Sequence, residues 1–175
     1  TSNYILSTMD KDKKNFKNVL SEAQALGYAE TNPKSDLNGE DVAAKLKILS
    51  SLCFNSFLND DIHIEGINDI KKIDIDNANK LGYKIKLLGV SEIINERLYQ
   101  RVHPTLIKKS SYIASIDGVL NAVIVDGKPV GQSVIQGEGA GPEATTSALI
   151  SDISSILRGN IKFPFSISNK NVQLL

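Results

Sequence analysis

Two neighbouring stretches decide the fold: YKIKLLGVSEII, residues 83–94, and RLYQRVHPTLI, residues 97–107. Both alternate apolar and polar side chains, which is the period of a strand with one face buried. GVLNAVIVDG (118–127) predicts a third and more apolar strand. DGKP (126–129) is typical of a hairpin turn, after which PVGQSVIQ (129–136) pairs back. The middle of the chain is therefore expected to form a meander of strands.

Helical patterns flank this meander on both sides. Apolar residues recur at spacings near 3.6 before a stop at Gly27, and a second run of this kind follows the turn signals of the loop 28–38. The expected helices span residues 3–9, 15–26, 40–54, 75–81 and 142–157, and DDIHIEGI (60–67) is expected to be a strand. This order predicts one α+β domain with a mainly antiparallel or mixed sheet and helices packed on one face.

Composition excludes several classes of partner. The chain has 175 residues, 20 basic and 20 acidic, so its formal net charge is zero. It carries no long basic run, so we expect neither a nucleic-acid partner nor an anionic membrane. Cys53 is the only cysteine, which excludes an internal disulfide and favours a reducing, cytoplasmic compartment. Cys53 falls among apolar residues on one side of the helix expected at 40–54, which predicts that its side chain packs in the core.

The helix expected at 40–54 raises a chemical question. At 100° per residue, Asp41 and Lys45 fall in the same stripe as Ile48 and Leu52. This spacing predicts that the charged side chains of Asp41 and Lys45 extend the buried side of the helix, whereas Lys47 lies on the solvent-exposed side. One interpretation is an i,i+4 ion pair worth a few tenths of a kcal/mol, roughly. The other is a lysine held by a carboxylate and ready to transfer a proton.

Two more carboxylates precede this helix, Glu30 and Asp36, in a loop that must fold back near it. Three carboxylates around Lys45 could bind the ammonium group of a substrate. The simpler alternatives are a capping or turn role for Asp36 and plain exposure for Glu30.

The stretch GEGAG, residues 137–141, joins the last strand to the last helix. Its glycines could let backbone amides approach a phosphate at the helix N-terminus, but a tight turn is the more economical interpretation. His63 and His103 both fall in strands, where structural roles are favoured. We expect no metal site from these two histidines and Cys53.

Several stretches together resemble the catalytic domain of homoserine dehydrogenases. They are TSNYIL (1–6), EAQALGYAETNPKSDLNGEDVAAKLKIL (22–49), IEGI (64–67), LGYKIKLLG (81–89), RVHPTL (101–106), and GVLNAV (118–123) followed by GEGAG and a helix. The resemblance covers nearly the whole chain in order. It implies an NAD(P)-dependent oxidoreductase that interconverts L-homoserine and L-aspartate 4-semialdehyde, in threonine, methionine and isoleucine biosynthesis.

The resemblance also assigns roles by motif. Lys45 resembles the family's proton donor or acceptor, with Asp41 one turn before it. Glu30, Asp41 and Asp36 become expected substrate-binding carboxylates. Gly27 and the segment Gly139, Ala140 and Gly141 are expected to border the cofactor.

The same resemblance sets expectations about organisation. Residues 1–175 correspond to the substrate-binding and dimerisation domain, without the family's Rossmann domain and regulatory domain. NAD(P) is then expected to be bound mainly by the missing Rossmann domain, the isolated chain is expected to be inactive, and a homodimer is expected. The alternative is a non-catalytic dimerisation module that kept this fold, and a less favoured one is a small phosphate-ligand binder that uses GEGAG.

Overall fold

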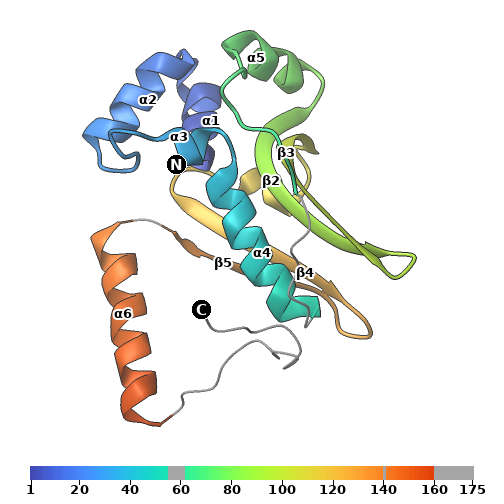
Figure 1. Ribbon diagram of the computed structural model, residues 1–175. Coiled ribbons are helices and arrows are strands. Elements are labelled where there is room, and N and C mark those ends of the chain that lie inside the picture. Colours follow the sequence, from blue (N-terminus) through green and yellow to red (C-terminus); the bar gives the residue numbers. More distant parts are fainter. Residues whose placement is uncertain (55–61, 140, 160–175) are drawn as a thin grey trace.

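The computed structural model describes residues 1–54, 62–139 and 141–159. Helices gather at the N-terminal half and two hairpins follow, with a last helix apart from both (Figure 1). The helices are α1 (Ser2–Asp12), α2 (Phe16–Ala25), α3 (Lys34–Leu37), α4 (Glu40–Phe54), α5 (Lys72–Lys80) and α6 (Pro142–Leu157), with the short 3-10 helix η1 (Tyr112–Ser115). The strands are β1 (His63–Ile64), β2 (Tyr83–Ile94), β3 (Arg97–Lys108), β4 (Leu120–Gly127) and β5 (Gly131–Glu138).

The strands form two sheets rather than one. The first has the order β1-β3-β2, with β1 parallel to β3 and β2 antiparallel to it, in a register that pairs Gly89 with Val102. The second is the antiparallel hairpin β4–β5. The α+β prediction is confirmed. The strand expected at 60–67 shortens to His63–Ile64, with residues 60 and 61 outside the described ranges.

Other boundaries move by a few residues. The loop predicted at 28–38 contains α3, and the helix predicted at 75–81 begins at Lys72. The bounds predicted for α4 and α6, residues 40–54 and 142–157, are those of the structure. Long periodic patterns with clear end signals thus predicted the bounds of these two helices, whereas the four-residue α3 is too short to leave such a pattern.

The main core lies where α1, α2 and the turn before α5 meet. Ile5, Leu6, Met9, Val19 and Ile67 are fully buried there. Ile85 and Leu87 of β2 pack against this cluster, so the core anchors the N-terminal helices to the first sheet. Burying such side chains is worth about 1.5–3 kcal/mol each.

The helix α4 lies on the first sheet with a different face from the one predicted. It buries Ala43, Leu46, Ser50 and Ser51. Gly89 of β2 lets the helix approach closely, because a Cβ there would lie 3.1 Å from Val42 Cγ1 and 3.5 Å from Leu46 Cβ. The contact face is therefore centred on Leu46, to one side of the expected stripe.

This rotation overturns three predictions about α4. Asp41 and Lys45 do not point into the core but lie at the side of the contact face, with side chains 38% and 61% exposed. Cys53 is exposed rather than packed in the core. Ser51, one turn after Lys47 and thus on the side expected to face solvent, is buried, and its hydroxyl donates to the Lys47 carbonyl oxygen at 2.8 Å.

The helix α6 stands apart from the rest of the molecule (Figure 1) and buries none of its residues. Its exposed apolar side chains are Leu149, Ile150, Ile153, Ile156 and Leu157. In the described part of the chain, no helix is both long enough and apolar enough to cross a membrane.

Candidate active site

A cleft of about 570 Å³ opens between the start of α1, the first turns of α4, the middle of β2 and the start of β4. Segments far apart in the sequence meet on its walls. Of the residues predicted to form the site, the cleft gathers Gly27, Glu30, Asp36, Asp41, Lys45 and Gly139. The structure thus brings together side chains and glycines that the sequence could only associate by motif.

The corner between α3 and α4 places two of the carboxylates. The Asn38 side-chain oxygen accepts from the Glu40 backbone N–H at 3.1 Å, an Asx turn that leads into α4. The Ile67 N–H donates to the Leu37 carbonyl oxygen at 2.7 Å, which fastens this corner to the segment after β1. Asp36 therefore lies just before the corner and Asp41 just after it.

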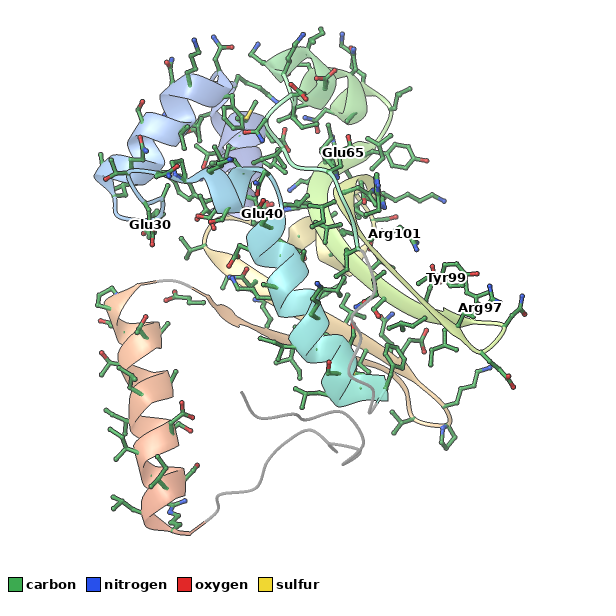
Figure 2. The ribbon with its side chains drawn as sticks, in the orientation of Figure 1. Glu30, Glu40, Glu65, Arg97, Tyr99 and Arg101 are labelled. Atoms are coloured by element: carbon green, nitrogen blue, oxygen red, sulfur yellow. The ribbon has the colours of Figure 1, made fainter. Side chains whose placement is uncertain are left out.

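The end of α2 places the third carboxylate. Gly27, with a φ of +76°, ends the helix, and the Tyr28 N–H returns to the Ala23 carbonyl oxygen at 2.8 Å. The Gln24 side chain then donates to the Glu30 carbonyl oxygen at 3.0 Å. Figure 2 shows Glu30 on this loop and Glu40 at the first turn of α4. The backbone at Glu30 is therefore tethered, and its carboxylate belongs to a residue that lines the cleft.

Lys45 and Asp41 form an ion pair on the rim of the cleft, with Lys45 Nζ 2.7 Å from Asp41 Oδ2. As an exposed i,i+4 pair it adds only a few tenths of a kcal/mol to stability, roughly. The position of the pair matters more than its stability, because both side chains line a cleft that Glu30 and Asp36 also line. An ammonium in such a place can exchange a proton with a ligand in the cleft.

Thr1, Asp36 and Tyr28 meet on the wall of the cleft where α1 begins. The Thr1 hydroxyl oxygen lies 2.7 Å from both the Tyr28 carbonyl oxygen and Asp36 Oδ2. A hydroxyl has one proton, so the two acceptors share it and keep lone pairs free. These lone pairs, with the Glu30 carboxylate, make this end of the cleft suitable for a cationic group.

A second lysine lines the cleft from the side of the first sheet. Lys86 of β2 is 5% exposed, and its Nζ lies 2.7 Å from Asp117 Oδ1. Burial lowers the pKa of Lys86, against the opposing effect of its hydrogen bond and charge pairing with Asp117. Burial alone would raise the pKa of Asp117, but hydrogen bonds from Lys84 and Lys86 outweigh it and lower that pKa.

The GEGAG turn reaches the cleft at Gly139. A Cβ at this position would lie 2.0 Å from Asn121 Nδ2, so any larger residue would have to displace the Asn121 side chain. Gly141, with a φ of +108°, precedes α6 and is not among the residues that line the cleft. Ala140 lies outside the described residues.

Sequence reasoning missed Thr1, Asn3, Tyr28, Lys86 and Asn121 as wall residues. All but Tyr28 lie in strands or at a helix start, where a polar residue looks like an ordinary solvent-facing position. For Lys86 in particular, the alternating pattern of β2 indicates exposure, and only tertiary contacts reveal its burial.

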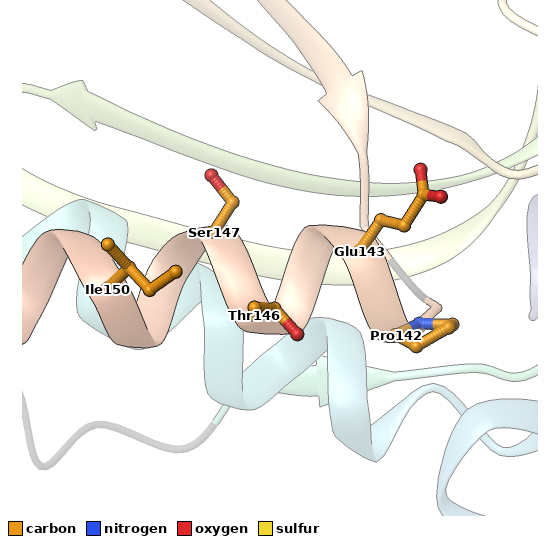
Figure 3. A pocket seen from close by; sticks show the side chains of 5 residues that line it. All are labelled: Pro142, Glu143, Thr146, Ser147 and Ile150. Atoms are coloured by element: carbon orange, nitrogen blue, oxygen red, sulfur yellow. The ribbon is translucent and has the colours of Figure 1, made fainter.

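A second hollow, of about 500 Å³, lies along α6 (Figure 3). Its lining residues all come from that single helix: Pro142, Glu143, Thr146, Ser147 and Ile150. It brings no separate segments together and has one ionisable group, Glu143.

The described residues contain no cluster of three or more His, Cys, Asp or Glu side chains that could hold a metal ion.

The chain is similar to known proteins in both sequence and fold. The sequence profile of the family "Homoserine dehydrogenase" matches residues 1–154. A homoserine dehydrogenase of Helicobacter pylori is 47% identical over 159 residues, which is 90% of this chain but 38% of that protein. The crystal structure of a homoserine dehydrogenase from Thiobacillus denitrificans superposes with a TM-score of 0.85 at 41% identity, covering 99% of this chain and 40% of that one.

Proposed function

The chain belongs to the homoserine dehydrogenase family, and we propose that its cleft binds the amino-acid substrate and transfers the proton in that family's reaction. The chain spans 38% of the length of the Helicobacter pylori relative, within the catalytic-domain region. The observation that supports the proposal most directly is the gathering of Lys45, Asp41 and Glu30 on one cleft.

The charges of the cleft match the substrate. L-Homoserine has an ammonium, a carboxylate and a primary alcohol. Glu30 and Asp36, with the Tyr28 carbonyl oxygen, offer acceptors for the ammonium at one end of the cleft. Lys45, at the start of α4, then meets the alcohol. Fixing one group of the substrate in this way aims its reacting carbon, and such alignment is a large part of enzymatic rate enhancement.

Lys45 moves the proton. In the oxidation of homoserine, neutral Lys45 accepts the hydroxyl proton as the substrate carbon gives up hydride. In the reduction of L-aspartate 4-semialdehyde, protonated Lys45 donates to the aldehyde oxygen as hydride arrives. Asp41, 2.7 Å from Lys45 Nζ, holds the ammonium form in place. A positioned proton-transfer group contributes roughly 10²–10⁴-fold to the rate.

We propose that Gly27 and Gly139 border one edge of a bound NAD(P) molecule. Gly27 and Gly139 line the cleft without side chains, and the space where a Cβ of Gly27 would lie is empty within 4 Å. When bound, the nicotinamide accepts or donates the hydride. We assign most of the cofactor's contacts to a Rossmann domain outside these residues, and NADP or NAD preference to that domain.

We further propose a homodimer and a role in threonine, methionine and isoleucine biosynthesis in the cytoplasm. Exposed apolar side chains on α4 and on β5 support the dimer: Ile48, Leu52, Val134 and Ile135. Larger apolar patches of this kind usually mark interfaces.

The test uses the natural full-length protein that contains these residues. With L-homoserine and NADP or NAD, we expect reduction of the cofactor, and none when L-homoserine is left out. L-Serine, one methylene shorter, is the matched control substrate and should react far more slowly. A purified, folded protein that binds nicotinamide cofactor but shows no homoserine-dependent turnover would contradict the proposal and favour a non-catalytic role.

A further inference from the structure

Lys86 is a buried cation with no free donor. Its Nζ lies 2.9 Å from Asn3 Oδ1, 2.5 Å from the Ile116 carbonyl oxygen and 2.7 Å from Asp117 Oδ1. An ammonium has three N–H donors, so these three acceptors use all of them. Although Lys86 borders the cleft, it has no donor left for a ligand. Its role must therefore act through the groups that it holds.

Those groups belong to two different walls of the cleft. Asn3 lies in the first turn of α1, whereas Ile116 and Asp117 belong to the segment that leads into β4. The Asn3 amide nitrogen in turn lies 3.1, 3.2 and 2.9 Å from the carbonyl oxygens of Ile116, Gly118 and Leu120. One ammonium on β2 thus fastens the start of α1 and the residues before β4 to the first sheet.

The network continues to the glycine turn. Asn121 follows Leu120, and its side chain lies against Gly139, where a Cβ would approach Asn121 Nδ2 to 2.0 Å. The wall that Lys86 holds is therefore in direct contact with the GEGAG turn. The distance between the substrate end of the cleft and this turn depends on where residues 116–121 lie.

We propose that Lys86 is a positioning residue, which sets the spacing between the Lys45 side of the cleft and the GEGAG turn. This inference rests on the proposed function for its catalytic consequence, but its structural content does not. Loss of the ammonium frees Asn3 and residues 116–121, and a wall displaced by about 1 Å can cost on the order of 10²-fold in rate. Substrate contacts themselves remain, so turnover suffers more than binding.

Lys84 is the matched control. It lies on the same face of β2, two residues earlier, and its Nζ is 2.7 Å from Asp117 Oδ2. Among the hydrogen bonds of the described residues, its ammonium bonds Asp117 but neither Asn3 nor the Ile116 carbonyl oxygen. It is also not among the residues that line the cleft. The two lysines share charge, strand and carboxylate partner, and differ in the contacts that the proposal invokes.

The experiment compares Lys86→Met and Lys84→Met in the natural full-length protein, with folded fraction measured by circular dichroism. For Lys86→Met we expect kcat per folded molecule to fall about tenfold or more, with KM for homoserine changed less than about threefold. For Lys84→Met we expect kcat within about twofold of the unmodified protein. Hydrogen exchange of residues 116–121 should quicken in Lys86→Met alone.

Two results would overturn the proposal. One is a Lys86→Met protein that loses stability but keeps kcat per folded molecule and the exchange of residues 116–121. The other is equal loss of kcat in both variants, which would assign the effect to Asp117. If the unmodified protein shows no homoserine-dependent turnover, the proposed function fails, and hydrogen exchange alone still decides whether Lys86 fixes this wall.

Discussion

Gly139 lines the cleft at a point where a side chain would collide with Asn121. The Asn121 side chain occupies the space that any Cβ at 139 would need. At Gly137, two residues earlier on β5, an added Cβ would have no neighbouring atom within 4 Å. Gly137 and Gly139 therefore have different reasons to be glycine, although the sequence presents them alike.

Gly139→Ala should displace Asn121 or the turn and lower kcat/KM for NAD(P) by about tenfold or more, because the approach to the cofactor changes. Its free energy of unfolding should change by less than about 1 kcal/mol, since the site is exposed and the Asn121 side chain can move. Steady-state kinetics of the full-length protein and urea unfolding measure the two effects.

Gly137→Ala is the control and should leave kcat/KM nearly unchanged. If the two alanine variants behave alike, contact with Asn121 has no functional weight. A second check is Asn121→Ala combined with Gly139→Ala, which removes the clash and should recover part of the lost activity.

The sequence predicted which residues share the cleft better than how they are oriented. The i,i+4 spacing of Asp41 and Lys45 correctly predicted an ion pair, which the structure has at 2.7 Å. Its predicted burial was wrong, because the face that α4 turns to the sheet depends on Gly89 of β2, a residue far along the chain. Helical periodicity gives relative angles around an axis and not the direction of the core.

The corner between α3 and α4 depends on Gly66, in the segment after β1. A Cβ at Gly66 would lie 2.2 Å from the Leu37 carbonyl oxygen and 2.4 Å from Asn38 Cα. Both neighbours are backbone atoms, which cannot move away as a flexible side chain would. Close packing at this point keeps Asp36 and Asp41 on the same cleft.

Gly66→Ala should therefore lower the free energy of unfolding by about 1–3 kcal/mol or more, as overpacking does elsewhere. We expect KM for homoserine to rise as well, because the corner that places Asp36 must shift. Chemical denaturation and steady-state kinetics would report the two changes. An alanine variant as stable as the unmodified protein would show that this corner is not packed as described.

Element boundaries could be predicted where a pattern was long and its ends were marked. The bounds of α4 follow from Asn38-Gly39 before it, and those of α6 from Pro142 at its first turn. By contrast, β1 consists of two residues and its partner Arg101–Val102 lies in β3. Pairing between such distant segments leaves no local signal.

The β4–β5 hairpin is where we place the contact of the proposed dimer. Within the described residues the second sheet consists of β4 and β5, and β5 exposes Val134 and Ile135. Sheets of two strands rarely stand alone, because a hairpin by itself is marginally stable in water. A second copy of the chain on this hairpin would cover these side chains, in line with the proposed dimer.

Light scattering of the full-length protein at micromolar concentration should give twice the mass of one chain. Ile135→Asp, in the middle of β5, should shift the protein toward monomer, because it would bury a charge at the interface. Val130→Asp is the control, since Val130 is 81% exposed at the hairpin turn. A monomeric mass for the unmodified protein, or equal effects of both variants, would contradict a dimer through this hairpin.

Replacement of Lys45 tests the central claim most directly. In the full-length protein, Lys45→Ala should lower kcat for homoserine oxidation by about 10²–10⁴-fold, while the far-ultraviolet circular dichroism stays unchanged. Lys47→Ala, an exposed lysine on the same helix, should leave kcat within about twofold. Equal kcat values for Lys45→Ala and the unmodified protein would remove Lys45 from proton transfer and contradict the account.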